Sequence, residues 1–445
     1  MRRRSRWWWT PAPDCDQAPV SRAVTTASTI LGVTTVGPPE QCDVLVVGAG
    51  PAGAAAATWL ARSGRDVVLA DAASFPRDKP CGDGLTPRAV SELTQLGLSE
   101  WLTGLARNWG LRATGFGEEL YLPWPGGSLP KFGGAARRTL LDTTLRDLAL
   151  AAGATGVVGR AVDVDTGFGP VNSVTFRTAD GMRTVNCRNL VVADGARSQL
   201  GRRLGREWHR STAYGVAARG YIASDRSDDP WISSHLELRD SSDEVLSGYG
   251  WVFPLADGTV NVGVGTLATS ARPAETNLRR LLGVYAEQRR EEWGLRGEVE
   301  APWSALLPMG GAVSGVAGPN WLLVGDAAGC VNPLNGEGID YGLETGRLAA
   351  ELLATGNDCS GWPSILASHY GQAFSIARRL AGLLTVPGLL PAAGPFGMRS
   401  RSLMKVALRL MGNLVTDEDR DLVARSWKVA GRASLRFDER PPFAA

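Results

Sequence analysis

Three glycines, Gly48, Gly50 and Gly53, follow the apolar stretch 44–47 and lead into an alanine-rich run. This spacing is typical of a strand–turn–helix unit that binds a dinucleotide. The first glycine permits the tight turn, the second lets the backbone approach a pyrophosphate, and the third lets the helix lie close to the strand. Phosphates would then lie at the helix N-terminus, where free N–H groups favour anions. Ala52 belongs to the same turn and is a further predicted contact.

A carboxylate completes this unit. Asp71 follows a second apolar stretch, 67–70, and Gly64 stands where the intervening helix should stop. At the end of the second strand, a carboxylate can accept hydrogen bonds from both hydroxyls of an adenosine ribose. The expected strand, the helix, the glycine that ends the helix and the final carboxylate occur in this order. A strand–helix–strand unit that binds no ligand is therefore the less favoured alternative.

Two further polar turns follow apolar stretches, Asp194–Gly195 and Gly325–Asp326. With the glycine turn they resemble, in order and spacing, the FAD-binding architecture of the para-hydroxybenzoate-hydroxylase-like flavoproteins. Asp326 can hold ribitol hydroxyls of an extended flavin dinucleotide, and 333–342 would begin a helix aimed at the isoalloxazine, where its N-terminus stabilises negative charge. The resemblance implies FAD rather than NAD. Since no separate nicotinamide domain is visible, the unidentified electron donor must dock transiently or be another protein.

A closer resemblance lies in the segments 75–90, FPRDKPCGDGLTPRAV, and 248–254, GYGWVFP. They are similar to the geranylgeranyl reductase family, flavoenzymes that hydrogenate isolated double bonds in polyprenyl chains. From about Asp43 to Pro442 the chain resembles the actinobacterial menaquinone reductases, which saturate one isoprene unit of the quinone tail. The resemblance implies an FAD-dependent oxidoreductase acting on CH–CH groups, with menaquinone as substrate. The alternatives are a geranylgeranyl lipid or diphosphate reductase, or an FAD-dependent aromatic hydroxylase or halogenase of the same fold.

The same resemblance implies a set of cofactor contacts. Arg138 could equally be a solvated arginine beside Arg137, and the strand register around Val162 is ambiguous. The implied FAD contacts are Gly53, Asp71, Cys81, Gly82, Gly84, Arg138, Val162, Asp326, Gly338 and Ile339.

Saturation of an isolated alkene requires a hydride and a proton from a positioned acid, in a dry site shaped for an aliphatic chain. Cys81 is the first candidate for the proton donor or positioner, and Tyr249 is the second. A buried thiol without a chemical role is the alternative for Cys81. Tyr249, Trp251 and Phe253 alternate along one strand and share a face. Trp251 and Phe253 are therefore predicted to bind the polyprenyl tail, with plain sheet core as the alternative.

These residues require an interleaved α/β architecture: a Rossmann-type FAD-binding domain, an antiparallel β-sheet substrate domain inserted into it, and a C-terminal helical region. An amphipathic helix is expected from Arg137 to Ala152, with Leu140 and Leu145 on its apolar face. The GxGxxA stretch 263–268 is expected to be a strand rather than a second nucleotide turn. The predicted boundaries are 1–41 for a disordered or misassigned leader, 43–110, 137–204 and 318–350 for the FAD-binding domain, 111–136 and 205–317 for the substrate domain, and 351–445 for the helical region.

Composition excludes several other classes. The 445 residues are 44% hydrophobic and carry a formal net charge of +2, so nothing drives the chain toward nucleic acid, and no binding motif for nucleic acid is visible. Six cysteines without a CxxC pair indicate reduced thiols. The three histidines lack metal-ligand spacing, and no metal is expected.

The stretch 380–398 carries no charge, but three prolines interrupt it and arginines flank it on both sides. It is therefore a poor membrane-spanning helix. Apolar surface bordered by cations suits a peripheral contact with an anionic membrane, and we expect this contact at the cytoplasmic face of the cell membrane. Helices packed over the FAD-binding domain are an equally favoured alternative.

Overall fold

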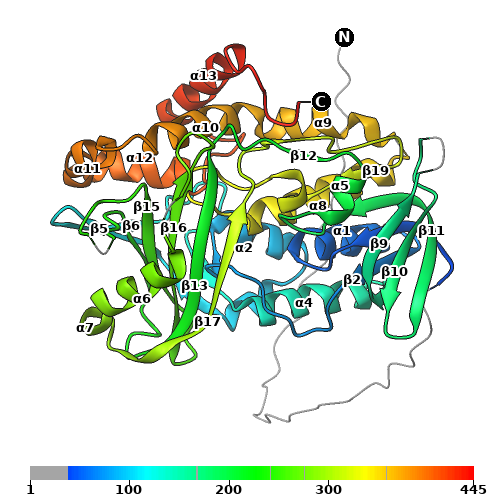
Figure 1. Cartoon of the computed structure of the whole chain (residues 1–445), viewed down its shortest axis with the longest axis horizontal. Coiled ribbons are helices and arrows are strands. Elements are labelled where there is room, and N and C mark those ends of the chain that lie inside the picture. The colour runs from blue at the N-terminus through cyan, green and yellow to red at the C-terminus, as the bar shows by residue number, and fades with distance from the viewer. Residues whose placement is uncertain (1–38, 167–168, 241, 275, 357, 445) are drawn as a thin grey trace, which may run out of the picture. The chain divides into compact units, whose positions relative to one another are not determined.

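The computed structural model describes residues 39–444 apart from 167–168, 241, 275 and 357, so most of the leader lies outside the described residues. The first layer is a seven-stranded mixed sheet in the order β8–β2–β1–β11–β10–β9, with β19 beside β11 (Figure 1). The pairs that join β8, β2, β1, β11 and β19 are parallel, whereas β9, β10 and β11 pair antiparallel. The strands are β1 Gln41–Val47, β2 Val67–Asp71, β8 Thr155–Val158, β9 Arg160–Asp165, β10 Ser173–Thr178, β11 Gly181–Val192 and β19 Trp321–Leu323.

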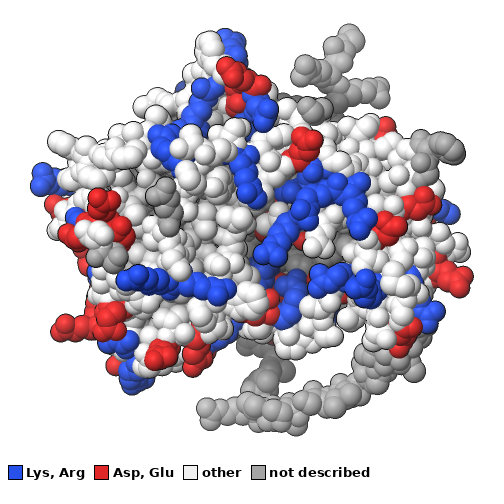
Figure 2. All heavy atoms as spheres, in the orientation of Figure 1, with Lys and Arg blue, Asp and Glu red and all other residues white. Residues whose placement is uncertain are grey.

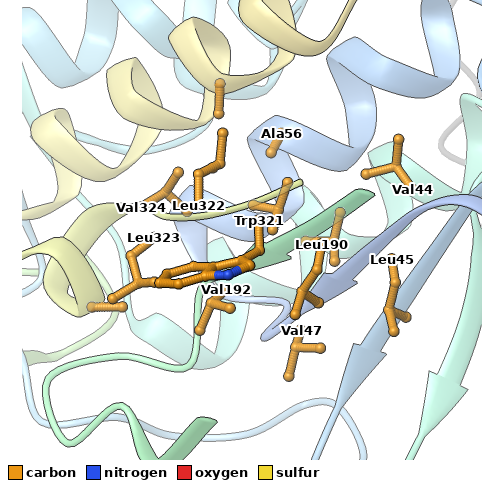
Figure 3. Close-up of a cluster of buried hydrophobic side chains, with 14 of the residues drawn as sticks. Val44, Leu45, Val47, Ala56, Leu190, Val192, Trp321, Leu322, Leu323 and Val324 are labelled. Atoms are coloured by element: carbon orange, nitrogen blue, oxygen red, sulfur yellow. The ribbon is translucent and has the colours of Figure 1, made fainter. Parts of the chain in front are cut away.

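Continuous apolar runs explain the parallel part of this sheet, because such strands are covered on both faces. Figure 3 shows how Leu45 and Val47 of β1, Leu190 and Val192 of β11, and Trp321 of β19 pack together. All five side chains are buried. The core of the nucleotide-binding unit therefore joins three chain segments that are far apart in sequence.

Three helices, α1 Pro51–Arg62, α4 Arg138–Ala151 and α8 Ile339–Ala354, pack together beside this sheet. The alanines of α1 allow α8 to approach closely: a Cβ on Gly346 would come within 2.4 Å of the Ala52 carbonyl oxygen. The helix expected from Arg137 is present, but its predicted apolar face is partly wrong. Leu140 is 48% exposed, while Leu145 is fully buried, because the helix turns Leu140 toward solvent.

The second layer is a seven-stranded sheet in the order β17–β13–β16–β15–β14–β5–β6, antiparallel except for the β14–β5 pair. Helix α6 Leu278–Gln288, followed by α7 Arg290–Trp293, packs on it. Helix α6 lies inside the segment 205–317, for which the sequence predicted a β-sheet domain and indicated no helix. The strands are β5 Gly110–Gly115, β6 Glu118–Pro123, β13 Tyr214–Ser224, β14 Ile232–His235, β15 Gly248–Pro254, β16 Thr259–Ala268 and β17 Leu295–Leu307.

Short elements complete the two layers. Strands β3 Gly84–Leu85, β4 Ala106–Asn108 and β7 Gly133–Ala135 form a small separate sheet, and β12 Glu207–Trp208 pairs with β18 Val313–Ser314. The remaining short helices of this part are α2 Pro87–Gln95, α3 Ser99–Thr103, α5 Gln199–Arg203 and the 3-10 turn η1 Gly325–Ala328.

The chain ends in helices that follow α8. Among the described residues, no single helix has the length and apolar content to cross a membrane; Cys359–Leu384 and Leu389–Arg399 together reach that length and composition, with a bend of 115° between them. These helical elements are η2 Cys359–Gly361, α9 Trp362–Leu366, the π-helical turn η3 Ala367–Gly371, α10 Gln372–Leu384, α11 Leu389–Arg399, α12 Arg401–Met411 and α13 Leu422–Arg436.

The predicted fold class is confirmed, and 263–268 lies within strand β16 as expected. Three elements do not follow the predicted domain boundaries. Strand β1 begins at Gln41, inside the expected leader, and α8 crosses the expected boundary at 350 because it continues to Ala354. Strand β7, assigned to the substrate domain, pairs instead with β3 and β4. The domain boundaries themselves stay predictions.

Candidate active site

A cavity of about 490 Å³ lies between the start of α1, the loop that contains Cys81, strand β15, the loop before α8, and helices α11 and α12. The two layers of the fold therefore meet at one hollow, and the C-terminal helices close its far end. Most of the residues singled out from the sequence line this cavity: Gly50, Ala52, Cys81, Gly82, Gly84, Arg138, Tyr249, Trp251, Phe253, Asp326, Gly338 and Ile339.

Gly48 and Gly53 lie in the same turn but outside the cavity lining. Gly48 has φ +106°, and a Cβ there would lie 2.2 Å from the Ala193 carbonyl oxygen. A Cβ on Gly53 would lie 1.8 Å from the carbonyl oxygen of Gly48. Both glycines are thus required by the packing of β1, β11 and α1, and that packing leaves Gly50 at the cavity.

Gly50 faces two guanidinium groups. A Cβ on it would lie 3.5 Å from Arg77 and 3.9 Å from Arg138, and no side chain caps the N-terminus of α1. Arg138 is buried and binds Asp142 through two hydrogen bonds of 2.7 and 2.8 Å, while Arg77 joins Asp142 at 2.8 Å and Asp71 at 3.4 Å. Two fixed guanidinium groups beside free helix N–H groups suit a pyrophosphate.

Asp71 stands at the end of β2, as the motif requires. Its Oδ2 accepts a hydrogen bond from the backbone N–H of Ala49 at 2.8 Å, and its Oδ1 accepts one from Ala73 at 3.0 Å. Each carboxylate oxygen can accept more than one hydrogen bond, so ribose hydroxyls can still be bound. The carboxylate is therefore held rigidly beside the glycine turn.

Asp326 lies on η1 at the cavity, where Lys79 binds its Oδ2 at 2.9 Å. Burial alone would raise the pKa of Asp326, but the nearby charges of Lys79, Arg138 and Arg206 outweigh burial and lower it. A Cβ on Gly338, at the start of α8, would come within 3.2 Å of Asp326 Oδ1. An ionised carboxylate thus faces the N-terminus of α8.

Glu337 occupies that N-terminus together with Gly338. Its Oε1 accepts hydrogen bonds from the backbone N–H groups of Ile339 at 2.9 Å and Asp340 at 3.3 Å. Burial, with the adjacent Asp340 carboxylate, raises the pKa of Glu337. The start of α8 therefore carries a carboxyl group that takes up a proton more readily than an exposed glutamate.

Cys81 is partly buried in the cavity wall. Its sulfur accepts a hydrogen bond from the backbone N–H of Asp83 at 3.4 Å. Burial raises the pKa of the thiol to about 11, and the charges of Asp83 and Glu337 contribute while Arg138 opposes them. The sulfur is therefore a protonated thiol near neutral pH, and it is the only described cysteine that is not buried.

The aromatic residues of β15 form a continuous row. Ring centroids lie 5.8 Å apart between Tyr249 and Trp251 and 6.3 Å apart between Trp251 and Phe253. A Cβ on Gly82 or Gly84 would come within 3.1–3.2 Å of the Phe253 ring, so the Cys81 loop rests on this row. The Tyr249 hydroxyl donates a hydrogen bond to the carbonyl oxygen of Asn335, and burial raises its pKa.

Beyond the aromatic row the cavity is mainly apolar. Its walls there come from strands β5, β6 and β14 on one side and from α11 and α12 on the other. The side chains at this end include Leu111, Leu122, Trp124, Ile232, Leu390, Met398, Met404, Leu408 and Met411.

Two further residues that the sequence singled out lie outside the cavity lining, and the predicted FAD contact of Val162 stays a prediction. Val162 lies at an irregularity of the β9–β10 pairing and does not line the cavity. Asp194, which marked the second polar turn, accepts hydrogen bonds from Ser198 at 2.6 Å and from the Leu200 N–H at 2.9 Å. It holds the start of α5, whereas the neighbouring Gly195 lines the cavity.

The sequence did not indicate Arg77, Lys79 and Asp83 as site residues, although all three lie in the segment that carried the resemblance. Asp83 and Lys79 line the cavity. A basic residue shortly after the strand that ends in Asp71 could have indicated Arg77. Among the described residues, no group of histidine, cysteine and carboxylate side chains is arranged to hold a metal ion.

The residues present fit an extended flavin dinucleotide. The Asp71 carboxylate suits the ribose, Arg77 and Arg138 suit the pyrophosphate, and Asp326 with the start of α8 suits the ribitol and the ring. Residues 41–380 match the sequence family described as FAD binding domain. FAD is the cofactor.

Two relatives cover nearly the whole chain. The menaquinone reductase of Mycolicibacterium smegmatis is 61% identical over 406 residues, which are 91% of this chain and 99% of that protein. The menaquinone reductase of Mycobacterium tuberculosis is 59% identical over 404 residues, with the same coverage. The chain therefore belongs to the FAD-binding-domain flavoproteins, in the group that contains the menaquinone reductases.

Solved structures show the same fold at lower identity. A geranylgeranyl bacteriochlorophyll reductase-like protein from Thermoplasma acidophilum superimposes with a TM-score of 0.68 at 21% identity, covering 88% of this chain and 96% of its own. A flavin-dependent brominase gives a TM-score of 0.68 at 18% identity, covering 89% of this chain and 100% of its own. A reductase-like protein and a halogenase thus share this fold, so the fold alone does not determine the activity.

Proposed function

We propose that this protein is an FAD-dependent reductase that saturates one isolated double bond in the polyprenyl tail of menaquinone. The observation that carries the proposal is the continuity of the cavity, in which the FAD-facing residues and a long apolar compartment share one hollow of about 490 Å³. A flat aromatic substrate would not need a compartment that runs from β15 to α11 and α12. A flexible hydrocarbon chain fits such a shape.

Bound and reduced FAD would supply the hydride for this reaction. The chain's own residues supply the remaining requirements. Cys81 holds a proton at Sγ in the cavity wall, because its pKa is raised to about 11. The row from Tyr249 to Phe253 and the apolar compartment exclude water, so the proton and the hydride reach the alkene in a dry site.

Cys81 is the better of the two predicted proton donors. The Tyr249 hydroxyl proton is engaged with the carbonyl oxygen of Asn335, whereas the Cys81 sulfur accepts a hydrogen bond and keeps its own proton free. Tyr249 is then a residue that orients the tail. The contacts of the two side chains support both assignments.

We propose further that α10, α11 and the turn between them contact the membrane from which the quinone tail enters. Leu383 is 55% exposed and Phe396 is 76% exposed, while Leu384 and Leu390 of the same segment line the cavity. Figure 2 shows the α11–α12 end of the viewed face largely free of charged side chains, with Lys or Arg at its edges. Such a surface suits an anionic membrane, at the cytoplasmic face of the cell.

The direct test is reduction of menaquinone in detergent. We would load purified protein with FAD, reduce it with dithionite, add menaquinone, and analyse the product by mass spectrometry. The expected product has gained two hydrogen atoms, located in the tail rather than the ring. If FAD is fully reduced and the tail is unchanged, the menaquinone assignment is wrong, and geranylgeranyl lipids are the next substrates to test.

The second candidate function is oxygen-dependent hydroxylation or halogenation, which the shared fold with the brominase favours. Consumption of oxygen with NADPH, and transfer of oxygen to an aromatic substrate, would support it. The apolar compartment beyond β15 supports the reductase, because a small aromatic substrate would leave that compartment unused.

A further inference from the structure

Asp83 is a fully buried carboxylate in the loop that forms the cavity wall next to Cys81. Its Oδ2 accepts hydrogen bonds from the Tyr221 hydroxyl at 2.8 Å and from the Asn261 amide at 2.9 Å. Its Oδ1 has no hydrogen-bond partner among the described residues. A buried carboxylate with one unpaired oxygen is costly, so its presence here requires an explanation beyond packing.

The contacts of Asp83 also hold Cys81. The backbone N–H of Asp83 donates to the Cys81 sulfur at 3.4 Å, and the Asn261 amide that binds Asp83 also donates to the Cys81 carbonyl oxygen at 2.8 Å. Trp251 fixes that amide by donating from Nε1 to Asn261 Oδ1 at 2.9 Å. The Asn261 side chain thus connects Cys81 and Asp83, the two ends of the turn, to Trp251 of strand β15.

The backbone of this turn is strained. Asp83 has φ +63°, which lies in the left-handed region that residues other than glycine seldom adopt. The hydrogen bonds from Tyr221 and Asn261 hold Asp83 in that conformation. A residue that only filled space here could be a glycine, as its neighbours Gly82 and Gly84 are.

The charged groups around the turn come from several elements. Arg219 of β13 and Arg138 of α4 act on Asp83, but each is paired with another carboxylate, Asp78 and Asp142 respectively. Burial outweighs both cations and raises the pKa of Asp83 to about 6. Asp83 is therefore mostly ionised above neutral pH.

Charged groups from three parts of the chain act on Cys81. Arg138 favours the thiolate, whereas Asp83 and Glu337 disfavour it, and the buried Tyr249 lines the same cavity. One cation and two carboxyl groups therefore act on the sulfur, and of the three residues Asp83 is the one that contacts it through its backbone N–H.

We propose that Asp83 is a positioning residue for Cys81: its backbone N–H and the Asn261 amide that it shares with Cys81 fix the sulfur in the cavity wall, and its negative charge keeps that sulfur protonated. The meaning for catalysis rests on the proposed function, because a thiol that retains its proton until the tail is in place can serve as the acid. The positioning itself does not depend on the substrate.

The test measures the rate of Cys81 alkylation by iodoacetamide against pH, on FAD-loaded protein without quinone, with the modified peptide quantified by mass spectrometry. Only the thiolate reacts, so the rate reports the ionisation of the sulfur. Asp83→Asn removes the charge and keeps the shape, and we expect alkylation about three- to tenfold faster at pH 8. Tyr221→Phe keeps the charge and should alkylate as slowly as the wild type.

Glu92→Gln is the matched control, because Glu92 is also buried but pairs with Arg347 between α2 and α8. An unchanged rate in folded Asp83→Asn would overturn the proposal. An equal acceleration in Tyr221→Phe would also overturn it, because loosening of the turn would then explain both. If Asp83→Asn does not fold, Asp83→Ser removes the same charge and decides the question in the same assay. Since no quinone is used, a failure here is distinct from a failure of the reduction assay.

Discussion

The indole ring of Trp251 lies against the backbone of Gly263: a Cβ on that glycine would come within 2.0 Å of the ring. The two residues are direct neighbours across the β15–β16 pair. The glycine therefore makes room for the ring that fixes Asn261 and, through it, the Cys81 turn. This explains the glycine of the 263–268 stretch without any nucleotide.

Gly263→Ala should displace Trp251 and loosen the Cys81 turn. We expect the free energy of unfolding to fall by about 1–3 kcal/mol, as for other overpacked cores, and reductase activity to fall with it. Thermal unfolding followed by circular dichroism measures the first effect. The control is Gly283→Ala in α6, where a Cβ meets nothing within 4 Å. That variant should be unchanged or stabilised by up to about 1 kcal/mol, and equal losses in both variants would contradict the explanation.

Arg77→Ala should weaken FAD binding. Arg77 is a cation at the Gly50 turn and also joins Asp71 to Asp142, so its removal takes away a charge-assisted contact and leaves two carboxylates without their shared partner. A loss of about 10- to 100-fold in affinity is expected. Quenching of FAD fluorescence on titration into apoprotein measures it. Arg188→Ala removes an 81% exposed cation paired with Asp43 and should leave the affinity unchanged.

Cys81→Ala should retain bound FAD and lose reductase activity. The thiol proton would be gone, while the loop keeps its contacts through the backbone and Asn261. Loss of a positioned acid reduces rates by about 100-fold or more. Cys81→Ser retains a hydroxyl proton and should recover part of the rate. Full activity of the alanine variant in the menaquinone assay, with normal FAD absorbance, would remove Cys81 from the mechanism.

The sequence identified the parts of the site whose chemistry is local. The turn from Gly48 to Gly53 and the carboxylate of Asp71 are read from a short segment, because the strand, turn and helix that use them are contiguous. The alternation of Tyr249, Trp251 and Phe253 likewise predicts their shared face. All of these features follow from backbone geometry over a few residues.

The parts that the sequence missed depend on distant pairings. Asp83 owes its importance to Asn261, 178 positions away, and Lys79 to Asp326, 247 positions away. No local pattern specifies such partners. Helix α6 was missed for a related reason: it is a short helix between long strands, and its apolar face is defined only by the sheet on which it packs.

The pH dependence of stability should change in Asp83→Asn. In the folded protein the pKa of Asp83 is raised from 3.8 to about 6 by burial, so the folded state binds a proton that the unfolded state has released between these values. The stability that this carboxyl contributes is full below about pH 4 and is lost as the pH rises through about 6.

Relative to the wild type, Asp83→Asn should therefore gain stability between pH 4 and pH 7, by up to about 3 kcal/mol. Urea unfolding of both proteins at matched pH values measures this difference. Other buried carboxyls titrate in the same range, so the comparison between variant and wild type is the informative quantity. A constant difference across this range would mean that Asp83 does not carry the raised pKa.

The proposed membrane contact predicts that binding to lipid depends on exposed apolar side chains of α10 and α11. Leu383→Ser with Phe396→Ser should reduce co-sedimentation with anionic vesicles by about tenfold or more, because two large apolar side chains no longer enter the interface. Phe437→Ser is the matched control: Phe437 is also 76% exposed but follows α13. An equal loss of vesicle binding in the double variant and in Phe437→Ser would indicate nonspecific hydrophobic binding rather than a specific contact through α10 and α11.

The same double variant separates the contact from the chemistry. The substituted side chains do not line the cavity, so reduction of menaquinone presented in detergent should stay near the wild-type rate. Reduction of menaquinone held in vesicles should fall with the loss of vesicle binding. If the rates in detergent and in vesicles fall together, the substitutions have damaged the cavity. That result would contradict the proposal that the tail enters through the surface of α10 and α11.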